Sequence, residues 1–274
     1  ISLHNKGVKI KAIIDIRENS DGDLVKKCND FGLKILWKHA VVTTKGRKKI
    51  NKVIVMKLSN NNNSVIGNAI KIDCDLLCIS GGYTPAVHLF TQSGGKLLYN
   101  ENKSYFYPGK NSLEQISIGS CTGIFNIKKI IDDTYTKVNQ FLKTNIKNDT
   151  LVSDMKSGGF ENIWLIPSNK IPGKSKSFVD FQNDSTANDI KLALREGFKS
   201  IEHVKRYTTT GMATDQGKIA NMHALGIISE HTKTKMGELG TTTFRPPYTP
   251  LTFGALVGRN VKKFFDITRR TPMH

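Results

Sequence analysis

Residues 205–218 read KRYTTTGMATDQGK and place cations, threonine hydroxyls, an aspartate and an amide within one short stretch. The stretch has neither the period of a helix nor the alternation of a strand, so it predicts a loop. Small donors and acceptors at this density can bind a polar ligand or can cap the neighbouring helices. The side chains that carry this chemistry are Arg206, Thr208, Thr209, Thr210, Asp215, Gln216 and Lys218.

A second candidate site lies in residues 79–90, ISGGYTPAVHLF. Gly81 and Gly82 follow an apolar run and allow a ligand to approach the backbone closely. Thr84 and the proline after it then favour a helix start. The G-G-x-x-P pattern is similar to the second glycine motif of flavoprotein disulfide reductases, and its alternative interpretation is a plain turn between a strand and a helix.

Residues 116–125, ISIGSCTGIF, indicate a third turn, with Gly119, Ser120 and Gly123 between an expected strand and an expected helix. Free N–H groups and the helix dipole at such a turn suit a pyrophosphate. In the reductase family an aspartate that holds a flavin ribitol stands at the position of Ser120. We therefore expect a dinucleotide without that contact, NAD, at this turn.

The acidic and basic side chains elsewhere give weaker signals. Asp15, at the end of an expected strand, can bind an adenine ribose, but no G-x-G-x-x-G precedes it and a solvated strand-end acid is the alternative. His88, His203 and His223 have no acid or nucleophile at diagnostic spacing, so we interpret them as packing or surface groups. We expect no catalytic residue and no metal site in this chain.

Charge and hydropathy exclude other classes of protein. The formal net charge is +18, but the lysines are scattered and base-reading arginines and aromatics are scarce, so we expect no nucleic-acid binding. No run of 18 apolar residues and no signal peptide are present, so we expect no membrane partner. Cys74 and Cys78, roughly 13 Å apart on one strand face, indicate free thiols in a reducing, cytoplasmic compartment. The start at Ile1 leads us to expect a part of a longer chain.

The hydrophobic pattern of the first 145 residues predicts an α/β unit. We expect strands at 8–15, 70–80 and 116–120, and helices at 23–32 and 123–144. The near-continuous apolar run at 70–80, IKIDCDLLCIS, is typical of a strand covered on both faces. We therefore expect a mostly parallel sheet, interrupted by a three-stranded antiparallel excursion with turns at Lys45–Gly46 and at SNNNNS.

The rest of the chain is expected to contain a linker, a helical unit and a connector. Residues 146–175 are polar and rich in glycine and proline, so they predict a linker. Residues 176–240 predict a small helical unit, in which Thr186 and Asp189 form a capping box and Ser200 begins a second helix. Residues 241–274, which contain FRPPYTP, predict an extended connector.

The helical unit resembles the small domain of bacterioferritin-associated ferredoxins. That family binds a [2Fe–2S] cluster through four cysteines, whose positions align with Asp180, Gln182, Asp215 and Ala220 here. Because the cluster needs thiolates, the resemblance implies a scaffold without a cluster.

The strings GGYTPAVHLFTQSGGKL, SFVDFQND, REGFKSIEHVKRYTTTGMATDQGK and GTTTFRPPYTPLTFGALVGR resemble the alpha subunits of heterotetrameric sarcosine oxidases. The resemblance implies a partial Rossmann-like, flavoprotein-reductase-type domain (1–145), the linker (146–175), the cluster-less helical domain (176–240), and the connector with the start of a folate-binding aminomethyltransferase domain (241–274).

The resemblance also implies cofactors and partners. In this family an FAD on the beta subunit oxidises sarcosine, an FMN at the alpha–beta interface passes the electrons to oxygen, and alpha binds NAD and tetrahydrofolate. The partners are the beta, gamma and delta subunits. The loop at 206–218 then has two interpretations, an FMN contact and helix capping. Other classes left open are a pyridine-nucleotide oxidoreductase, an opine-oxidase-like alpha subunit, which normally keeps its cysteines, and a non-catalytic interaction module.

Overall fold

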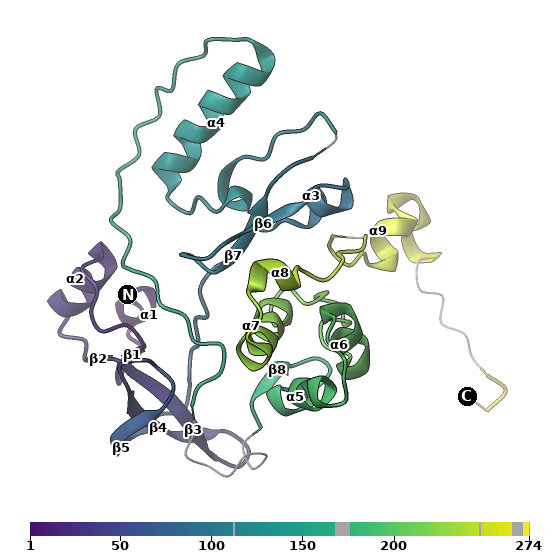
Figure 1. Ribbon diagram of the computed structural model, residues 1–274. Helices are drawn as coiled ribbons and strands as arrows, with labels where there is room; N and C mark the ends of the chain where they lie inside the picture. Colours follow the sequence, from purple (N-terminus) through teal and green to yellow (C-terminus); the bar gives the residue numbers. More distant parts are fainter. Residues whose placement is uncertain (112, 168–175, 247, 265–270, 274) are drawn as a thin grey trace.

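The computed structural model describes residues 1–111, 113–167, 176–246, 248–264 and 271–273 (Figure 1). The chain begins with a short helix, α1 (Ser2–Asn5). Strand β1 (Ile13–Asp15) then pairs in parallel with β2 (Ile35–Trp37), and α2 (Asp23–Asp30) connects the two strands. This small β–α–β arrangement lies where the sequence predicts the start of an α/β unit.

The predicted antiparallel excursion is confirmed. Strands β3 (His39–Gly46), β4 (Ile50–Leu58) and β5 (Val65–Asp73) form one sheet in the order β3-β4-β5. Its core contains Ala40, Leu58 and Val65, and Ile163 and Ile166 of the linker pack against it. The linker thus contacts this sheet, and its teal trace passes close to β3 in Figure 1.

The mostly parallel sheet is not found in the described residues, where β1 and β2 are the one parallel pair. The strand expected over 70–80 ends at Asp73, within β5, and residues 74–80 are neither helix nor strand. Leu76 and Ile79 are 66% and 82% exposed, so the prediction of a strand covered on both faces is wrong for this chain. An apolar run becomes a buried strand only when neighbouring strands continue the ladder of backbone hydrogen bonds. Here the Cys74 N–H still donates to the Asn51 carbonyl at 3.2 Å, but residues 75–80 pair with no strand among the described residues.

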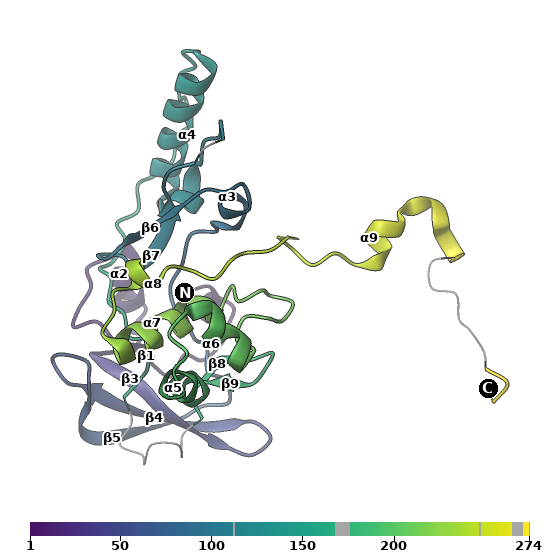
Figure 2. The same ribbon diagram turned by 45° about the vertical axis from the view of Figure 1, so that its right-hand side comes forward.

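A hairpin and two helices follow. Helix α3 (His88–Gln92) precedes the antiparallel strands β6 (Leu97–Asn100) and β7 (Tyr105–Pro108). The strand predicted at 116–120 is wrong, because a 3-10 turn, η1 (Gly119–Thr122), stands there. The long helix predicted at 123–144 is present as α4 (Ile127–Leu142), which projects from the body in Figures 1 and 2.

The helical unit forms the largest core. It contains β8 (Phe178–Asp180), β9 (Ser185–Thr186), α5 (Ala187–Arg195), α6 (Ile201–Thr208), α7 (Ala220–Thr232) and α8 (Met236–Leu239). The predicted capping box of Thr186 and Asp189 is confirmed, and Ser200 is the N-cap residue of α6 but makes no capping hydrogen bond. The core also takes in Phe106 of β7 and Trp164 of the linker, so the hairpin and the helical unit share one hydrophobic cluster.

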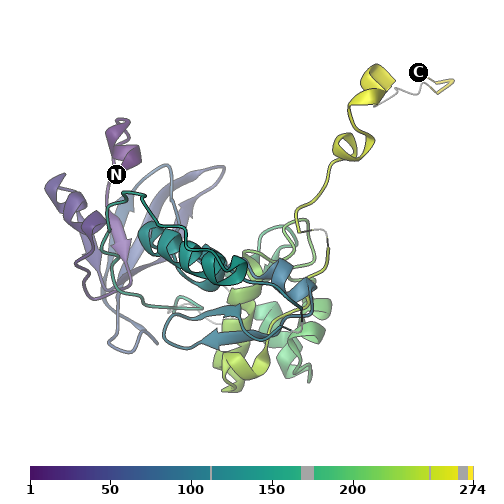
Figure 3. The ribbon, with the colours of Figure 1, turned by 90° about the horizontal axis from the view of Figure 1, so that it is seen from above.

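The last described residues form an arm. After α8 the chain runs without regular structure to α9 (Phe253–Val257) and the 3-10 segment η2 (Arg259–Phe264). Figures 2 and 3 show α9 extended away from the rest of the molecule. No residue of α9 is buried, and Phe253 is 79% exposed. Residues 241–246 and 248–252, within the predicted connector, form neither helix nor strand.

Candidate functional site

The loop between α6 and α7 is tied to the start of the helical unit by Asp180. One carboxylate oxygen of Asp180 accepts the Gly211 N–H at 2.7 Å, and the other accepts the N–H groups of Gln182 and Asn183 at 2.9 and 3.0 Å. Burial alone would raise the pKa of Asp180, but these three backbone donors outweigh burial and hold the pKa below its usual value. Gln182 makes a second hydrogen bond to the loop, because its amide oxygen accepts the Thr214 hydroxyl at 3.0 Å.

The threonines of the loop turn inward. The Thr208 hydroxyl donates to the Val204 carbonyl at 2.8 Å and lies 2.8 Å from the Thr210 hydroxyl, and both side chains are buried. The Thr208 carbonyl in turn accepts the hydroxyls of Ser185 and Thr209. Thr208 and Thr210 therefore hold the loop to the helices, which is the capping role, and Thr209 alone of the three is exposed.

Two glycines let α7 approach the loop. Gly211 and Gly217 have φ of +71° and +73°, and a Cβ on either would stand within 2.3 Å of the Asn221 side-chain oxygen. The Asn221 amide donates to the Thr242 hydroxyl at 3.0 Å, so this side chain also holds the connector. Asp215 closes the turn by accepting the Gly217 N–H at 3.1 Å.

The cations at the two ends of the loop have different surroundings. Arg206 is 56% exposed in its side chain and pairs with Glu202 on the same helix at 3.4 Å. The Lys218 ammonium donates to the Tyr248 carbonyl at 2.7 Å and lies 4.2 Å from the centroid of the Tyr248 ring. Gln216 lies between the two ends, with a φ of +52°.

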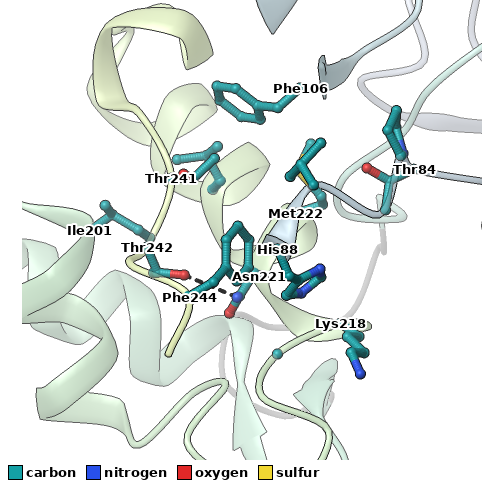
Figure 4. A pocket seen from close by; sticks show the side chains of 14 residues that line it. Thr84, His88, Phe106, Ile201, Lys218, Asn221, Met222, Thr241, Thr242 and Phe244 are labelled. Atoms are coloured by element: carbon teal, nitrogen blue, oxygen red, sulfur yellow. Dashed lines mark hydrogen bonds between the residues drawn. The ribbon is translucent and has the colours of Figure 1, made fainter. Parts of the chain in front are cut away.

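A cavity of about 40 Å³ lies where the loop, α3, α7 and the connector meet (Figure 4). By the measure in which one water occupies roughly 10–15 Å³, it has room for about three small groups, far less than a flavin or a dinucleotide. Its walls are mainly apolar. The polar residues that line it are Thr84, His88, Lys218, Asn221, Thr241 and Thr242.

His88 is buried at this cavity with 7% of its surface exposed. Its ring lies against Phe244, with centroids 4.1 Å apart, and edge-on to Tyr248 at 5.2 Å. Neither ring nitrogen has a hydrogen-bond partner among the described residues. Burial lowers the pKa of His88, and the nearby charge of Lys218 lowers it further.

Thr84 and Lys218 both line this cavity, so one predicted turn and the end of the loop contribute to the same cavity. Gly81 and Gly82 are exposed in an extended segment, and Gly82 has a φ of +87°. Gly81 faces the His223 ring of α7, and a Cβ there would lie 3.8 Å from it.

The other predicted turn lies apart from this cavity and is explained by packing. A Cβ on Gly123 would lie 2.2–2.5 Å from the ring and hydroxyl of Tyr105, whose hydroxyl donates to the Gly123 carbonyl at 2.9 Å. Gly119 is buried with a φ of +74°, and Ser120 is exposed. Helix α4 starts four residues after Gly123 and its N-terminus is capped by the Asn126 side chain.

Asp15 lies at the end of β1 with its carboxylate bound to Arg17. The Arg17 side chain and backbone N–H donate to it, the shortest contact being 2.6 Å from Nη2. Burial would raise the pKa of Asp15, but the hydrogen bonds and charge of Arg17 outweigh burial and lower it. The carboxylate is therefore engaged within the chain.

Sequence reasoning did not single out His88, Asn221, Phe244 and Tyr248 as site residues. No local motif joins them, because they come from α3, α7 and the connector. The aromatic and proline run FRPPYTP was the available signal, since an extended aromatic segment needs a surface to pack on.

The four positions aligned with cluster cysteines are distributed in the same unit. Asp180 and Gln182 bind the loop, Asp215 accepts a loop N–H, and Ala220 is buried at the start of α7. Among the described residues no group of three or more histidine, cysteine, aspartate or glutamate side chains could hold a metal ion. Within that same part of the chain, no helix is long and apolar enough to cross a membrane.

Comparison with solved structures finds an L-proline dehydrogenase from P. horikoshii with a TM-score of 0.61 and 16% identity. The match covers 93% of this chain and 52% of that one, and at this identity it concerns the fold alone. Residues 174–259, which contain the loop and the helical unit, match the sarcosine oxidase A3 domain family.

Curated relatives extend the match to nearly the whole chain. The chain is 36% identical over 99% of its length to the sarcosine oxidase subunit alpha of Rhizobium meliloti (strain 1021). It is 31% and 32% identical, over 97% of its length, to the alpha subunits of Corynebacterium sp. strains P-1 and U-96. It spans 26–28% of the length of these relatives. The chain is therefore similar over nearly its whole length to one part of three sarcosine oxidase alpha subunits, and its residues 174–259 match the sarcosine oxidase A3 domain family.

Proposed function

We propose that this chain is part of the alpha subunit of a sarcosine oxidase complex. In that role the complex demethylates sarcosine to glycine with oxygen and tetrahydrofolate, and releases hydrogen peroxide and methylene-tetrahydrofolate. The observation that carries the proposal is the 31–36% identity to three sarcosine oxidase alpha subunits over 97–99% of this chain. Within the complex the chain positions cofactors, and we assign it no catalytic step.

The loop between α6 and α7 is proposed to face FMN at an interface with the beta subunit. Asp180, Thr208 and Thr210 are engaged in fixing the loop, so they act as supports. Thr209 on the loop and Arg206 in the last turn of α6 are exposed, and Lys218 is half-buried at the other end of the loop. Because the cavity beside Lys218 is too small for a flavin, FMN would lie on the outer surface of the loop, against the partner.

The proposal for NAD rests on the extended segment at Gly81–Thr84. Its glycines are exposed and Gly82 has a φ that favours glycine. Asp15 and the N-terminus of α4 do not fit a dinucleotide in this arrangement, because Arg17 occupies the first and Asn126 caps the second. FAD and tetrahydrofolate are proposed to bind outside this chain, and the gamma and delta subunits to complete a cytoplasmic complex.

The proposal is tested by co-expressing this chain, within its alpha subunit, with the beta, gamma and delta subunits. We expect a complex that produces hydrogen peroxide and glycine when sarcosine is added. A second preparation carries Lys218→Met and Arg206→Met, which remove both cations from the loop. We expect it to assemble, with a shifted FMN reduction potential and slower electron transfer between the flavins.

Three results would contradict parts of this proposal. A complex without sarcosine-dependent peroxide would remove the sarcosine oxidase function and favour an interaction module. An unchanged potential and transfer rate in the double variant would assign the loop to capping alone. For NAD the matched variant is Gly81→Val, since a Cβ on Gly81 would make only an ordinary van der Waals contact with the His223 ring and its φ does not require glycine. Equal NAD affinity of parent and variant would remove the glycine segment from the site.

A further inference from the structure

The small cavity between α3, α7 and the connector holds a polar group that the fold leaves without a partner. His88 is more than nine-tenths buried and lines the cavity, and neither of its ring nitrogens has a hydrogen-bond partner among the described residues. A buried imidazole without partners is destabilising, and such groups in native proteins are normally satisfied by a water, an ion or a ligand. A bound molecule in the cavity would supply the missing partner.

The charges around the cavity favour an anion. Lys218 contributes an ammonium with three donors, of which the Tyr248 carbonyl takes one. The cavity also lies at the N-terminus of α7, a helix of 13 residues, whose dipole favours negative charge. Among the described residues, no aspartate or glutamate lines it. A metal cation is disfavoured by the same features.

The size and the walls restrict the anion further. About 40 Å³ accommodates roughly three water-sized groups, which is the size of a formate or the carboxylate end of acetate. Phe106, Met222 and Leu225 are apolar residues of the cavity wall, and Figure 4 shows the first two. A carboxylate has two oxygens, so it can accept from His88 with one and from Lys218 with the other, while its carbon end meets the apolar wall.

We propose that the cavity lined by His88 and Lys218 is a binding site for a small carboxylate, up to about the size of acetate. The ligand contacts α3, α7 and the connector at once. It therefore joins the connector to the rest of the chain. This inference does not depend on the proposed function, which rests on sequence similarity.

The test uses the 274-residue chain labelled with ¹⁵N-histidine and titrated with acetate at constant ionic strength. The His88 ring signals are assigned by their loss in His88→Phe, which keeps an aromatic ring against Phe244. We expect a saturable shift of the His88 signals and a higher pKa of His88 in the presence of acetate, because the anion stabilises the imidazolium. Lys218→Met should weaken acetate binding on the order of tenfold or more.

The controls separate the carboxylate from other occupants. Lys199→Met removes an exposed lysine outside the cavity and should bind acetate like the parent. Chloride at the same ionic strength and neutral acetamide should give no saturable shift. Saturable binding of chloride or acetamide would overturn the carboxylate assignment. A His88 shift that grows linearly with acetate concentration would also overturn it and would indicate water as the ordinary occupant of the cavity. If His88→Phe does not fold, Lys218→Met still tests the proposal. Acetate affinity equal to that of the parent in Lys218→Met would contradict it.

Discussion

A single carboxylate organises the loop that carries most of the candidate site residues. Asp180 lies at the end of β8 and accepts three backbone N–H groups, from Gln182, Asn183 and Gly211. Two of these donors are local, and the third is 31 positions away in the loop. The carboxylate therefore fixes the loop to the helical unit with bonds that a neutral side chain cannot reproduce. The rigidity of the loop follows from this residue and from the two glycines that face Asn221.

Replacement of Asp180 by asparagine should destabilise the chain. An amide removes the negative charge, and one of its ends becomes a donor that faces a backbone N–H group. Since hydrogen bonds to charged groups contribute about 1.5–3 kcal/mol, we expect a loss of about 2–3 kcal/mol in the free energy of unfolding, measured with urea. Asp149→Asn, at an exposed carboxylate of the linker, should change it by less than about 0.5 kcal/mol. Equal stabilities of the two variants would contradict this role of Asp180.

The pKa of His88 predicts a second effect at the scale of one residue. Burial and the charge of Lys218 lower this pKa in the folded chain, and Tyr248 is the other titratable side chain against the ring. As the pH falls through about 6.5, the ordinary pKa of histidine, His88 of the unfolded chain binds a proton. His88 of the folded chain has a lower pKa and stays neutral there, so the free energy of unfolding decreases. The decrease stops once the pH is below the folded pKa.

Unfolding of the parent chain and of His88→Phe at pH 7.5 and 5.5 measures this contribution. The phenylalanine variant cannot bind the proton in either state, so it should lose less stability than the parent over this range. The other six histidines of the chain are common to both proteins. Identical losses would show that His88 titrates alike in the folded and unfolded states.

At the scale of elements, the helix starts show which sequence signals are realised. Thr186 accepts the Asp189 N–H at 3.3 Å, and the Asp189 carboxylate accepts the Thr186 N–H at 2.8 Å, which completes the capping box of α5. Ser200 occupies the same N-cap position of α6, but its side chain makes no capping hydrogen bond. The residue type predicts where a helix is capped, whereas the contribution of the cap to stability depends on the hydrogen bond that its side chain makes.

These two caps make a matched pair for mutation. Thr186→Ala should reduce the free energy of unfolding by about 1 kcal/mol, within the usual range of roughly 0.5–2 kcal/mol for a lost cap. Ser200→Ala should have a smaller effect, because no capping bond is lost. The measurement is urea unfolding followed by circular dichroism at 222 nm. A larger loss for Ser200→Ala than for Thr186→Ala would contradict this account.

Local signals predicted the elements that are stabilised by near neighbours. The antiparallel sheet β3-β4-β5, helix α4 and the capped α5 all follow from alternation, period and turn residues within a few positions. The strand expected at 70–80 ends at Asp73 and the strand expected at 116–120 is absent, because a parallel pairing needs a partner from elsewhere in the chain. The apolar composition of such a segment indicates that it packs against another part of a protein, but it does not identify that part.

At the scale of the whole molecule, the cores do not follow the boundaries expected from the sequence. The cluster of the helical unit includes Phe106 of β7 and Trp164 of the linker, and Gly226 of α7 leaves room for the Trp164 ring. The cavity is likewise assembled from α3, α7 and the connector, so its central histidine could not be identified from local spacing. The stretch at 205–218 was identified from composition alone, because its donors are contiguous, and the structure places residues 205–208 of it in the last turn of α6 and the rest in the loop.

The exposed apolar residues predict how the molecule behaves in a larger assembly. Leu76 and Ile79 are 66% and 82% exposed in this chain, which spans about a quarter of its relatives. Adjacent exposed apolar side chains of this kind commonly mark contact with another polypeptide segment. We therefore expect Leu76→Gln and Ile79→Gln to leave the unfolding free energy of this chain within about 0.5 kcal/mol of the parent.

Within the complete alpha subunit the same substitutions should lower the yield of assembled complex, because each would place an amide in a covered apolar site. Gel filtration of the co-expressed subunits measures this yield. Leu151→Gln is the control, since Leu151 is fully exposed at 100% in the polar linker. It should leave both the chain and the complex unchanged. If the variants at 76 and 79 assemble as well as the control, residues 74–80 stay exposed in the complex, and their apolar character has another cause.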